Sequence, residues 1–313
     1  MLIARILRIA LLAGIGVVFG VAAALVANTA AGWPLALLLA LLLVPIGHAA
    51  VLGIQFVVGI SVGDGHWRGA GSAWLGEILA SMRTFLFAIP LSGRREPRST
   101  GGDRLPVVLV HGYFCNHAVW DPFSRHLRRA GHPVRVIDLE PAFGSIDEYA
   151  LTIAAAVDSA SADGRPVVLV GHSMGGLAIR AFLRQAGRSA VAGMVTLGSP
   201  HRGTHAASLG QTLNARQMRR GSAWLAALEA HERIADFPPC SVIITRNDNI
   251  VYPQAEQVLP GARVLRVDGI GHLGLVYDAA VWRLVEEEIR RFEAIAADSV
   301  ARTPGADVAN PVA

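Results

Sequence analysis

The segment Val-Val-Leu-Val-Gly-His-Ser-Met-Gly-Gly at residues 167–176 constrains the fold of this 313-residue chain more than any other feature. Four apolar residues typical of a buried strand run into a turn centred on Ser173, and a helical pattern follows. The turn is so sharp that the serine backbone must be strained, and Gly171 and Gly175 leave room where a side chain would collide with neighbouring backbone. The hydroxyl then projects at a helix N-terminus, whose partial positive charge favours a developing anion. We predict that Ser173 is a nucleophile; the alternative is a packing turn with an idle serine.

A nucleophilic serine needs a base and a group that orients the base. After a strand–turn–helix of this kind, the acid comes next along the chain and the histidine follows it. Asp248 lies just past one expected strand, and His272 lies in a glycine-rich loop past the next. We predict Asp248 as the acid and His272 as the base, against the alternatives of a turn aspartate and a surface histidine. Asp268, at a strand end, and Asp278, after the histidine, are weaker candidates for the acid.

The oxygen of a tetrahedral intermediate needs two backbone N–H donors. One should belong to Met174, which follows the nucleophile, and the other should come from the loop after the first core strand. That loop reads His-Gly-Tyr-Phe from residue 111. The glycine lets the backbone approach, so we choose the N–H of Tyr113, with that of Phe114 second. An ordinary strand-to-loop turn is the alternative.

Apolar β-branched runs alternate with helical stretches from Leu105 onward, which indicates an α/β domain with a mostly parallel central sheet flanked by helices. An amphipathic helix over residues 281–297 should close this domain, which we place at residues 105–297. The tail 298–313 should be flexible. The expected strands are Val107–Val110, Val134–Asp138, Val167–Val170, Ala192–Leu197, Ser241–Thr245 and Arg263–Val267.

The connection at residues 201–239 is several times longer than the median of roughly 4–6 residues, so it must hold structure of its own. We predict a small helical lid that sets substrate preference, with Trp224 and Leu225 lining the substrate pocket. Phe114 and His172 should also contact substrate. The alternative is an excursion that packs on the edge of the sheet without touching substrate.

Two long apolar runs, residues 2–27 and 33–60, precede the sheet domain. Each is long enough to cross a bilayer, which needs roughly 20 helical residues, so we predict that residues 1–62 form a transmembrane helical hairpin. The alternative is a signal peptide cleaved near Ala30, although the first run exceeds the apolar core of roughly 7–15 residues that is usual in signals.

Arginines flank the apolar runs asymmetrically. Arg5 and Arg8 precede the first predicted helix, several arginines follow the second, and the connector between them has none. The positive-inside rule then places both ends of the hairpin, and the sheet domain, in the cytoplasm.

Residues 63–104 join the hairpin to the sheet domain. Within them, residues 72–91 carry apolar side chains with a rough helical period. An interfacial helix lying on the membrane and a helix packed against the sheet domain are both open. Residues 94–104 are polar with Pro, Gly and Ser, which is typical of a linker.

Composition narrows the possible functions. All 28 basic residues are arginine, yet no stretch interleaves dense arginine with aromatics, so we expect no nucleic-acid partner. Cys115 and Cys240 are too few for a disulfide framework. His201 and His205 have the helical spacing of metal ligands, but without an obvious third ligand we interpret them as polar loop residues and expect no metal.

The residues quoted so far, together with Gly-Ser-Pro-His-Arg-Gly-Thr at 198–204, resemble the bacterial lipase/esterase branch of the α/β-hydrolase superfamily. The resemblance covers about residues 105–295. It implies an α/β-hydrolase fold and ester hydrolysis through an acyl-enzyme, with no cofactor. The N-terminal hairpin lies outside the usual lipase pattern.

We therefore expect a membrane-anchored serine hydrolase in a bacterial inner membrane that cleaves carboxylic esters or lipids, with no protein partner. A thioesterase, an amidase or an acyltransferase could use the same three residues. A non-catalytic membrane protein that keeps the fold as a binding module is the alternative from another class.

Overall fold

The structure is a computed structural model that describes residues 2–26, 32–93, 102–232 and 237–301. Most of the predicted linker 94–104 and the end of the predicted tail 298–313 lie outside the described residues.

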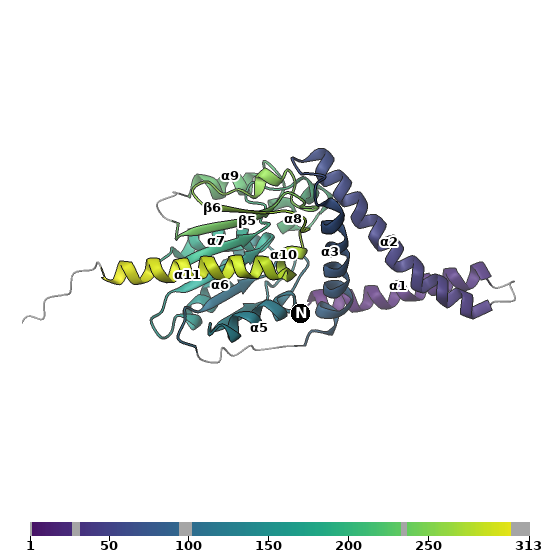
Figure 1. Ribbon diagram of the computed structural model, residues 1–313, viewed down its shortest axis with the longest axis horizontal. Coiled ribbons are helices and arrows are strands. Elements are labelled where there is room, and N and C mark those ends of the chain that lie inside the picture. The colour runs from purple at the N-terminus through teal and green to yellow at the C-terminus, as the bar shows by residue number, and fades with distance from the viewer. Residues whose placement is uncertain (1, 27–31, 94–101, 233–236, 302–313) are drawn as a thin grey trace, which may run out of the picture.

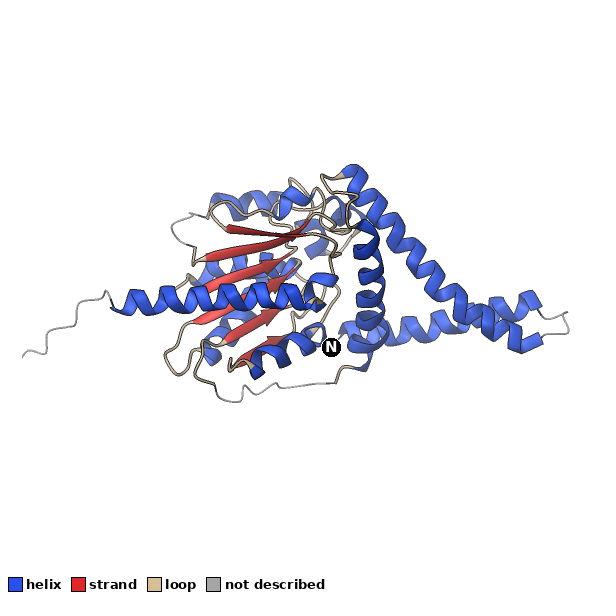
Figure 2. Ribbon diagram, viewed as in Figure 1, coloured by secondary structure: helices blue, strands red, loops and turns tan. Residues whose placement is uncertain are grey.

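Six parallel strands form one sheet in the order β2-β1-β3-β4-β5-β6 (Figure 2). Valine, isoleucine and leucine dominate them, and every residue of β1 and β3 is buried, as expected for strands covered on both faces. The six strands expected from the sequence are confirmed, with ends that differ by two residues or fewer. Their bounds are β1 (Val107–Val110), β2 (Val134–Ile137), β3 (Val167–His172), β4 (Val191–Leu197), β5 (Cys240–Thr245) and β6 (Arg263–Val267).

Helices connect the strands and cover both faces of the sheet (Figures 1 and 2). The α-helices of this part are α5 (Asp121–Arg129), α6 (Tyr149–Ala160), α7 (Met174–Ala186), α8 (Leu213–Gln217), α9 (Ala223–Ala230), α10 (Gly274–Tyr277) and α11 (Ala279–Ala301). Short 3₁₀ turns are η2 (His117–Trp120), η3 (Ile146–Glu148), η4 (His205–Leu209) and η6 (Gln254–Gln257). The closing helix α11 extends to Ala301, beyond its predicted end at residue 297.

The core has two layers, one on each face of the sheet. Val108 and Val110 pack with residues of α6, α7 and α9. Val107 and Leu109 pack with residues of α5, α10 and α11. Successive strand residues point to opposite faces, so the apolar run of β1 supplies both layers.

The N-terminal residues form helices where the apolar runs predicted them. They comprise α1 (Leu2–Val26), α2 (Gly32–Val62), α3 (Ala70–Met82), a π-helical stretch η1 (Arg83–Ala88) and α4 (Ile89–Leu91). α1 and α2 project together from the sheet domain, and α3 crosses between their inner ends (Figure 1). By length and composition, two stretches of the described residues could cross a membrane, Pro45–Val62 within α2 and Ala70–Leu91.

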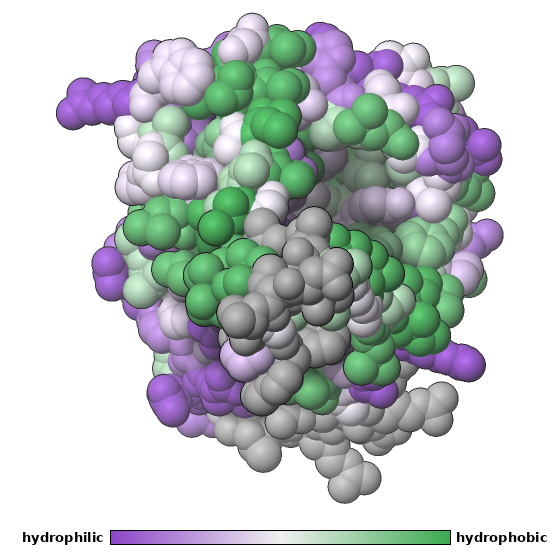
Figure 3. Space-filling view, turned by 90° about the vertical axis from the view of Figure 1, so that its right-hand side faces the viewer, coloured by the Kyte–Doolittle hydropathy of each residue, from purple (hydrophilic) through white to green (hydrophobic). Residues whose placement is uncertain are grey.

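The helical stretch from α3 to α4 has one face packed against the rest of the molecule, as one of the two alternatives for residues 72–91 predicted, and one exposed face. Ala73, Glu77 and Thr84 are buried against the rest of the molecule. Leu79 and Leu91, by contrast, are 63% and 77% exposed. Figure 3, viewed from the side on which α1 and α2 project, shows hydrophobic residues over much of this surface.

Candidate active site

Ser173 sits on the sharp turn that joins β3 to α7. Its φ of 55° and ψ of −126° lie in a region that L-residues rarely adopt, as the sequence predicted for this turn. A Cβ at Gly175 would lie 2.4 Å from the carbonyl oxygen of Val110, and one at Gly171 would lie 2.7 Å from the amide of Gly176. Only glycine fits at either place, so the two glycines allow the turn that presents the serine.

Asp248 and His272 meet at the carboxyl ends of β5 and β6. His272 Nδ1 lies 2.9 Å from Asp248 Oδ2, and since a carboxylate only accepts, Nδ1–H is the donor. The other carboxylate oxygen, Oδ1, accepts from the amides of Ile250 and Val251 at 2.9 and 2.7 Å. Asp248 is 1% exposed and is therefore held in one orientation.

The other two candidate acids lie elsewhere. Asp268 forms a surface ion pair with Arg246, in which the nearest N–O distance is 2.7 Å. Asp278 accepts from the amides of Ala280 and Val281 at the start of α11. Neither carboxylate contacts His272 through a described hydrogen bond, so the structure brings Asp248 to the histidine.

The end of β4 brings the serine turn close to the Asp248–His272 pair. Ser173 N donates to Leu197 O at 2.9 Å, which fixes the turn on β4. A Cβ at the next residue, Gly198, would lie 3.2 Å from both Asp248 Oδ2 and His272 Nδ1. The three predicted residues thus lie at the same carboxyl edge of the sheet, just past β3, β5 and β6.

His172 lies beside the ring of His272 and not at the surface. The two ring centroids are 4.7 Å apart, and His172 Nε2–H donates to the carbonyl oxygen of His272 at 3.1 Å. Burial and the neighbouring His272 lower the pKa of His172 well below its ordinary value. We infer that a neutral His172 supports the loop of His272, whereas the sequence predicted a contact with substrate.

The electrostatics of the pair favour a histidine that can hold a proton. Burial lowers the pKa of His272, but the carboxylates of Asp248 and Glu77 raise it, and the net pKa lies above the ordinary value. A buried imidazolium next to a fixed carboxylate is the charge distribution that a general base needs after it takes a proton.

The loop after β1 approaches the serine from the other side. A Cβ at Gly112 would lie 2.9 Å from Ser173 Cβ, so the close approach requires glycine. His111 fixes the loop, because its Nδ1–H donates to Gly112 O at 2.8 Å and its Nε2 accepts from Leu139 N at 3.0 Å. Phe114 has a φ of 57°, which turns the chain sharply just after Tyr113.

Aromatic rings surround the loop after β1. Phe114 stacks on Phe143 with ring centroids 6.1 Å apart, and Tyr113 lies at similar distances from both rings. Phe85, from η1, lies 6.3 Å from Phe114. Phe114, a predicted substrate contact, therefore belongs to an apolar wall that α3–η1 completes. The hydroxyls of Tyr113 and Thr212 form a hydrogen bond of 3.1 Å, which ties the lid segment to this loop.

The predicted lid residue Trp224 contacts the end of α7 that lies away from Ser173. Trp224 Nε1 donates to Asp147 at 2.9 Å, and Asp147 pairs with Arg184 at 2.6 Å. Arg184 lies in the last turn of α7, about 15 Å along the helix axis from Met174. Leu225 is buried in the core layer that contains α6 and α7. These contacts favour the alternative of a packed excursion for α9.

Three side chains that sequence reasoning missed support the loops of the pair. Glu77 accepts from the two amides that follow His272. Asn249 Oδ1 accepts from His272 N at 3.1 Å, and Asn249 Nδ2 donates to Gln55 Oε1 on α2. One signal was available, because Glu77 is the only acidic residue between Asp64 and Glu96 in the sequence and stands within an apolar helical pattern.

Two further residues discussed in the sequence analysis, His201 and Cys115, are buried. His201 lies in the loop after β4, as predicted, but is buried there, and its Nε2 forms a 2.9 Å hydrogen bond with Thr196 Oγ1. Burial raises the pKa of Cys115 to about 12, which leaves an unreactive thiol. Among the residues that the structure describes, no group of three His, Cys, Asp or Glu side chains could hold a metal ion.

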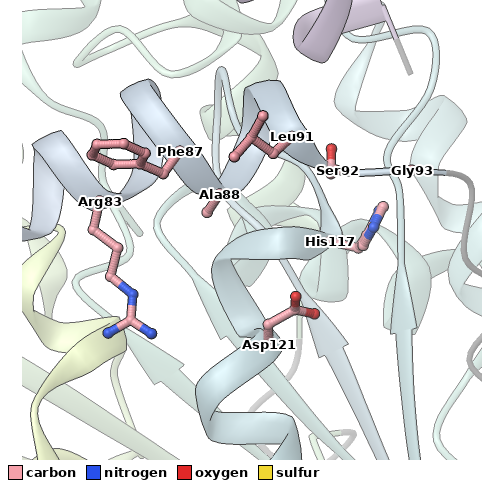
Figure 4. A pocket seen from close by; sticks show the side chains of 8 residues that line it. All are labelled: Arg83, Phe87, Ala88, Leu91, Ser92, Gly93, His117 and Asp121. Atoms are coloured by element: carbon pink, nitrogen blue, oxygen red, sulfur yellow. The ribbon is translucent and has the colours of Figure 1, made fainter.

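A cavity of about 330 Å³ lies beside the loop after β1 (Figure 4). Arg83, Phe87 and Leu91 reach it from the η1–α4 stretch, and His117 and Asp121 reach it from η2 and α5. None of its lining residues is Ser173, Asp248 or His272, so this cavity is distinct from the candidate site.

Comparisons with known proteins agree with the observed architecture. Residues 107–239 match the model of the Alpha/beta hydrolase family, a range that contains Ser173 but ends before Asp248 and His272. Esterase PIR7B of Oryza sativa subsp. japonica is 35% identical over 108 residues, or 31% of this chain. The match spans only 40% of the length of that relative.

Two solved structures share the fold. The mature form of a Bacillus licheniformis lipase has a TM-score of 0.55 and 17% identity, over 62% of this chain and 96% of that one. Aspergillus fumigatus lipase B has a TM-score of 0.52 and 19% identity, over 60% of this chain and 54% of that one. These likenesses establish the α/β-hydrolase fold for this chain.

Proposed function

We propose that this chain is a serine ester hydrolase held at a membrane by α1 and α2. The observation that carries the proposal is the buried 2.9 Å hydrogen bond between His272 Nδ1 and Asp248 Oδ2, at the same edge of the sheet as the strained Ser173. The esterase and lipase names of the similar proteins point in the same direction.

The chemistry follows from these atoms. Asp248 accepts Nδ1–H and so leaves the Nε2 lone pair of His272 free to take the proton of Ser173 as its oxygen attacks an ester carbonyl. The N–H groups of Met174 and Tyr113 hold the oxyanion; Met174 begins α7, where helix amides have no intrahelical partner. His272 returns the proton to the departing alcohol, then activates water, which releases the acid from Ser173.

The membrane anchor is supported by the surfaces of α1 and α2. Leu12, Ile46 and Ile54 are 72%, 61% and 63% exposed on helices that project away from the sheet domain. Apolar surface on this scale is unfavourable in water and favourable in lipid. An ester or lipid substrate would then be cleaved close to the bilayer, next to the aromatic wall around Phe114.

The decisive experiment uses the full-length chain in detergent with a fluorophosphonate probe and a p-nitrophenyl ester series. We expect the wild-type protein to be labelled and to hydrolyse at least one ester, and Ser173→Ala to do neither. Absence of labelling in a folded wild-type protein would support the binding-module alternative. If the protein is labelled but hydrolyses no ester, Ser173 would still be a nucleophile, and the substrate would be a thioester, an amide or the donor in an acyl transfer.

A further inference from the structure

The backbone around His272 is held by side chains from helices that precede the sheet domain. We propose that Glu77 of α3 is a positioning residue for His272, so that docking of the N-terminal helices completes the candidate active site. This inference rests on the proposed function, because it takes His272 as the base for Ser173.

The carboxylate of Glu77 is enclosed by the loop that follows β6. Oε1 accepts from Leu273 N at 3.0 Å, and Oε2 accepts from Gly274 N at 2.9 Å. A Cβ at Gly271 would lie only 2.5 Å from Oε2. Glu77 is 3% exposed. The residues immediately before and after His272 therefore wrap around one buried carboxylate, which fixes the path of the backbone through the histidine.

A second N-terminal helix holds His272 through Asn249. The amide of His272 donates to Asn249 Oδ1 at 3.1 Å, while Asn249 Nδ2 donates to Gln55 Oε1 on α2 at 3.2 Å. Asn249 is buried and adjoins Asp248 in the chain. The base and its acid thus share a support that reaches α2, independently of the contact that reaches α3.

The carboxylate of Glu77 also affects the pKa of the His272 imidazole. The titratable groups that face His272 are Asp248 from the loop after β5, Glu77 from α3 and His172 from the end of β3. The two carboxylates raise the pKa of His272, and burial lowers that of His172, which leaves this ring neutral. Burial raises the pKa of Glu77 above its ordinary value and Asp248 adds to that shift, while the two amides and the imidazolium oppose it.

The test compares Glu77→Gln and Glu77→Asp with a matched control, Glu229→Gln, at an exposed position on α9. Full-length proteins in detergent are assayed with p-nitrophenyl butyrate across pH. We expect Glu77→Gln to lower kcat by about 100-fold with little change in KM, because a slightly misplaced base slows proton transfer. The acid limb of the pH profile of kcat for Glu77→Gln should move to lower pH, since removal of a negative charge lowers the pKa of His272.

Glu77→Asp tests the charge of the carboxylate separately from the length of the side chain that carries it. It keeps the carboxylate, so its acid limb should stay near that of the wild type, while its shorter side chain lowers kcat. Glu229→Gln should match the wild type in both respects. The rate at which a fluorophosphonate labels Ser173 gives a second readout that needs no ester. A protein that is labelled but turns over no ester would therefore overturn ester hydrolysis while still testing Glu77.

Two outcomes would overturn the role of Glu77. One is wild-type kcat and labelling in Glu77→Gln. The other is a loss of activity with the acid limb unmoved in a variant of unchanged melting temperature, which would reduce Glu77 to a structural anchor. Should Glu77→Gln fail to fold, Glu77→Asp and Gln55→Ala decide, and normal kcat and labelling in both variants would contradict the proposal.

Discussion

Backbone strain is found at two single residues beside the candidate site. Ser173 and Phe114 are the non-glycine residues with positive φ in the described chain, and both adjoin the place where an oxyanion would form. Such conformations cost on the order of 1–3 kcal/mol each and persist only where the surroundings enforce them. Here the absence of side chains at Gly112, Gly171 and Gly175 lets neighbouring backbone pack closely around Ser173 and hold its strained conformation.

The acid can be tested at the residue scale by comparing two aspartates. Asp248→Asn should lower kcat for p-nitrophenyl esters by roughly three or more orders of magnitude, because an amide in place of the carboxylate no longer stabilises the imidazolium. Asp268→Asn breaks only an exposed ion pair with Arg246 and should leave kcat within about twofold. Near-normal turnover in Asp248→Asn would move the acid to another residue.

At the scale of elements, the segment at residues 201–239 has structure of its own, as its length predicted. It contains η4, α8 and α9, and its residues 233–236 lie outside the described range. Its two ends differ in what they contact. Thr212, at the start of α8, reaches Tyr113 beside the candidate site, whereas α9 packs on the far part of α7 through Trp224 and Leu225.

Substitutions in α9 test whether this helix lines a substrate pocket or only packs in the core. Trp224→Ala and Leu225→Ala should each lower the free energy of unfolding by about 2–5 kcal/mol, because both remove packed side chains. The ratio of kcat/KM for butyrate and decanoate esters should stay unchanged, as in a control, Leu209→Ala, at an 86% exposed position. A tenfold shift of that ratio in either α9 variant would restore the pocket-lining role predicted from the sequence.

At the scale of the whole molecule, the N-terminal helices contact the sheet domain on the side of the candidate site. The N-terminal end of α1 returns to the sheet domain, where Leu2 N donates to Glu140 Oε1 at 3.2 Å and Arg8 donates to the carbonyl oxygen of Ser92. Near the C-terminal end of α2, the carbonyl oxygen of Gly59 accepts a hydrogen bond from the side chain of Gln254 in η6. Both apolar helices are thus anchored at the edge of the sheet that carries Ser173.

This geometry agrees with a hairpin whose two ends lie on one side of a membrane. In a bacterial host, alkaline phosphatase fused after Ala313 should be inactive, because the sheet domain would remain in the cytoplasm. The same reporter inserted in the connector at residues 28–32 should be active. An active C-terminal fusion would reverse the orientation and favour the cleaved-signal alternative.

The sequence by itself determined the strands and the three residues at their ends. β-Branched apolar runs are local signals, and the glycines around Ser173 are required by the shape of its own turn. Asp248 and His272 could be placed because parallel strands bring their carboxyl ends to one edge of the sheet, wherever the intervening chain goes.

Only the tertiary structure decided which distant side chains support those residues. Glu77 lies 196 residues before Leu273 in the chain, and no local pattern links the two. Trp224 could equally have faced the substrate or the core, because an amphipathic helix shows that one face is buried but not what buries it. Contacts of this kind are set by how whole elements dock, which depends on shape and burial across the molecule and not on periodicity within a segment.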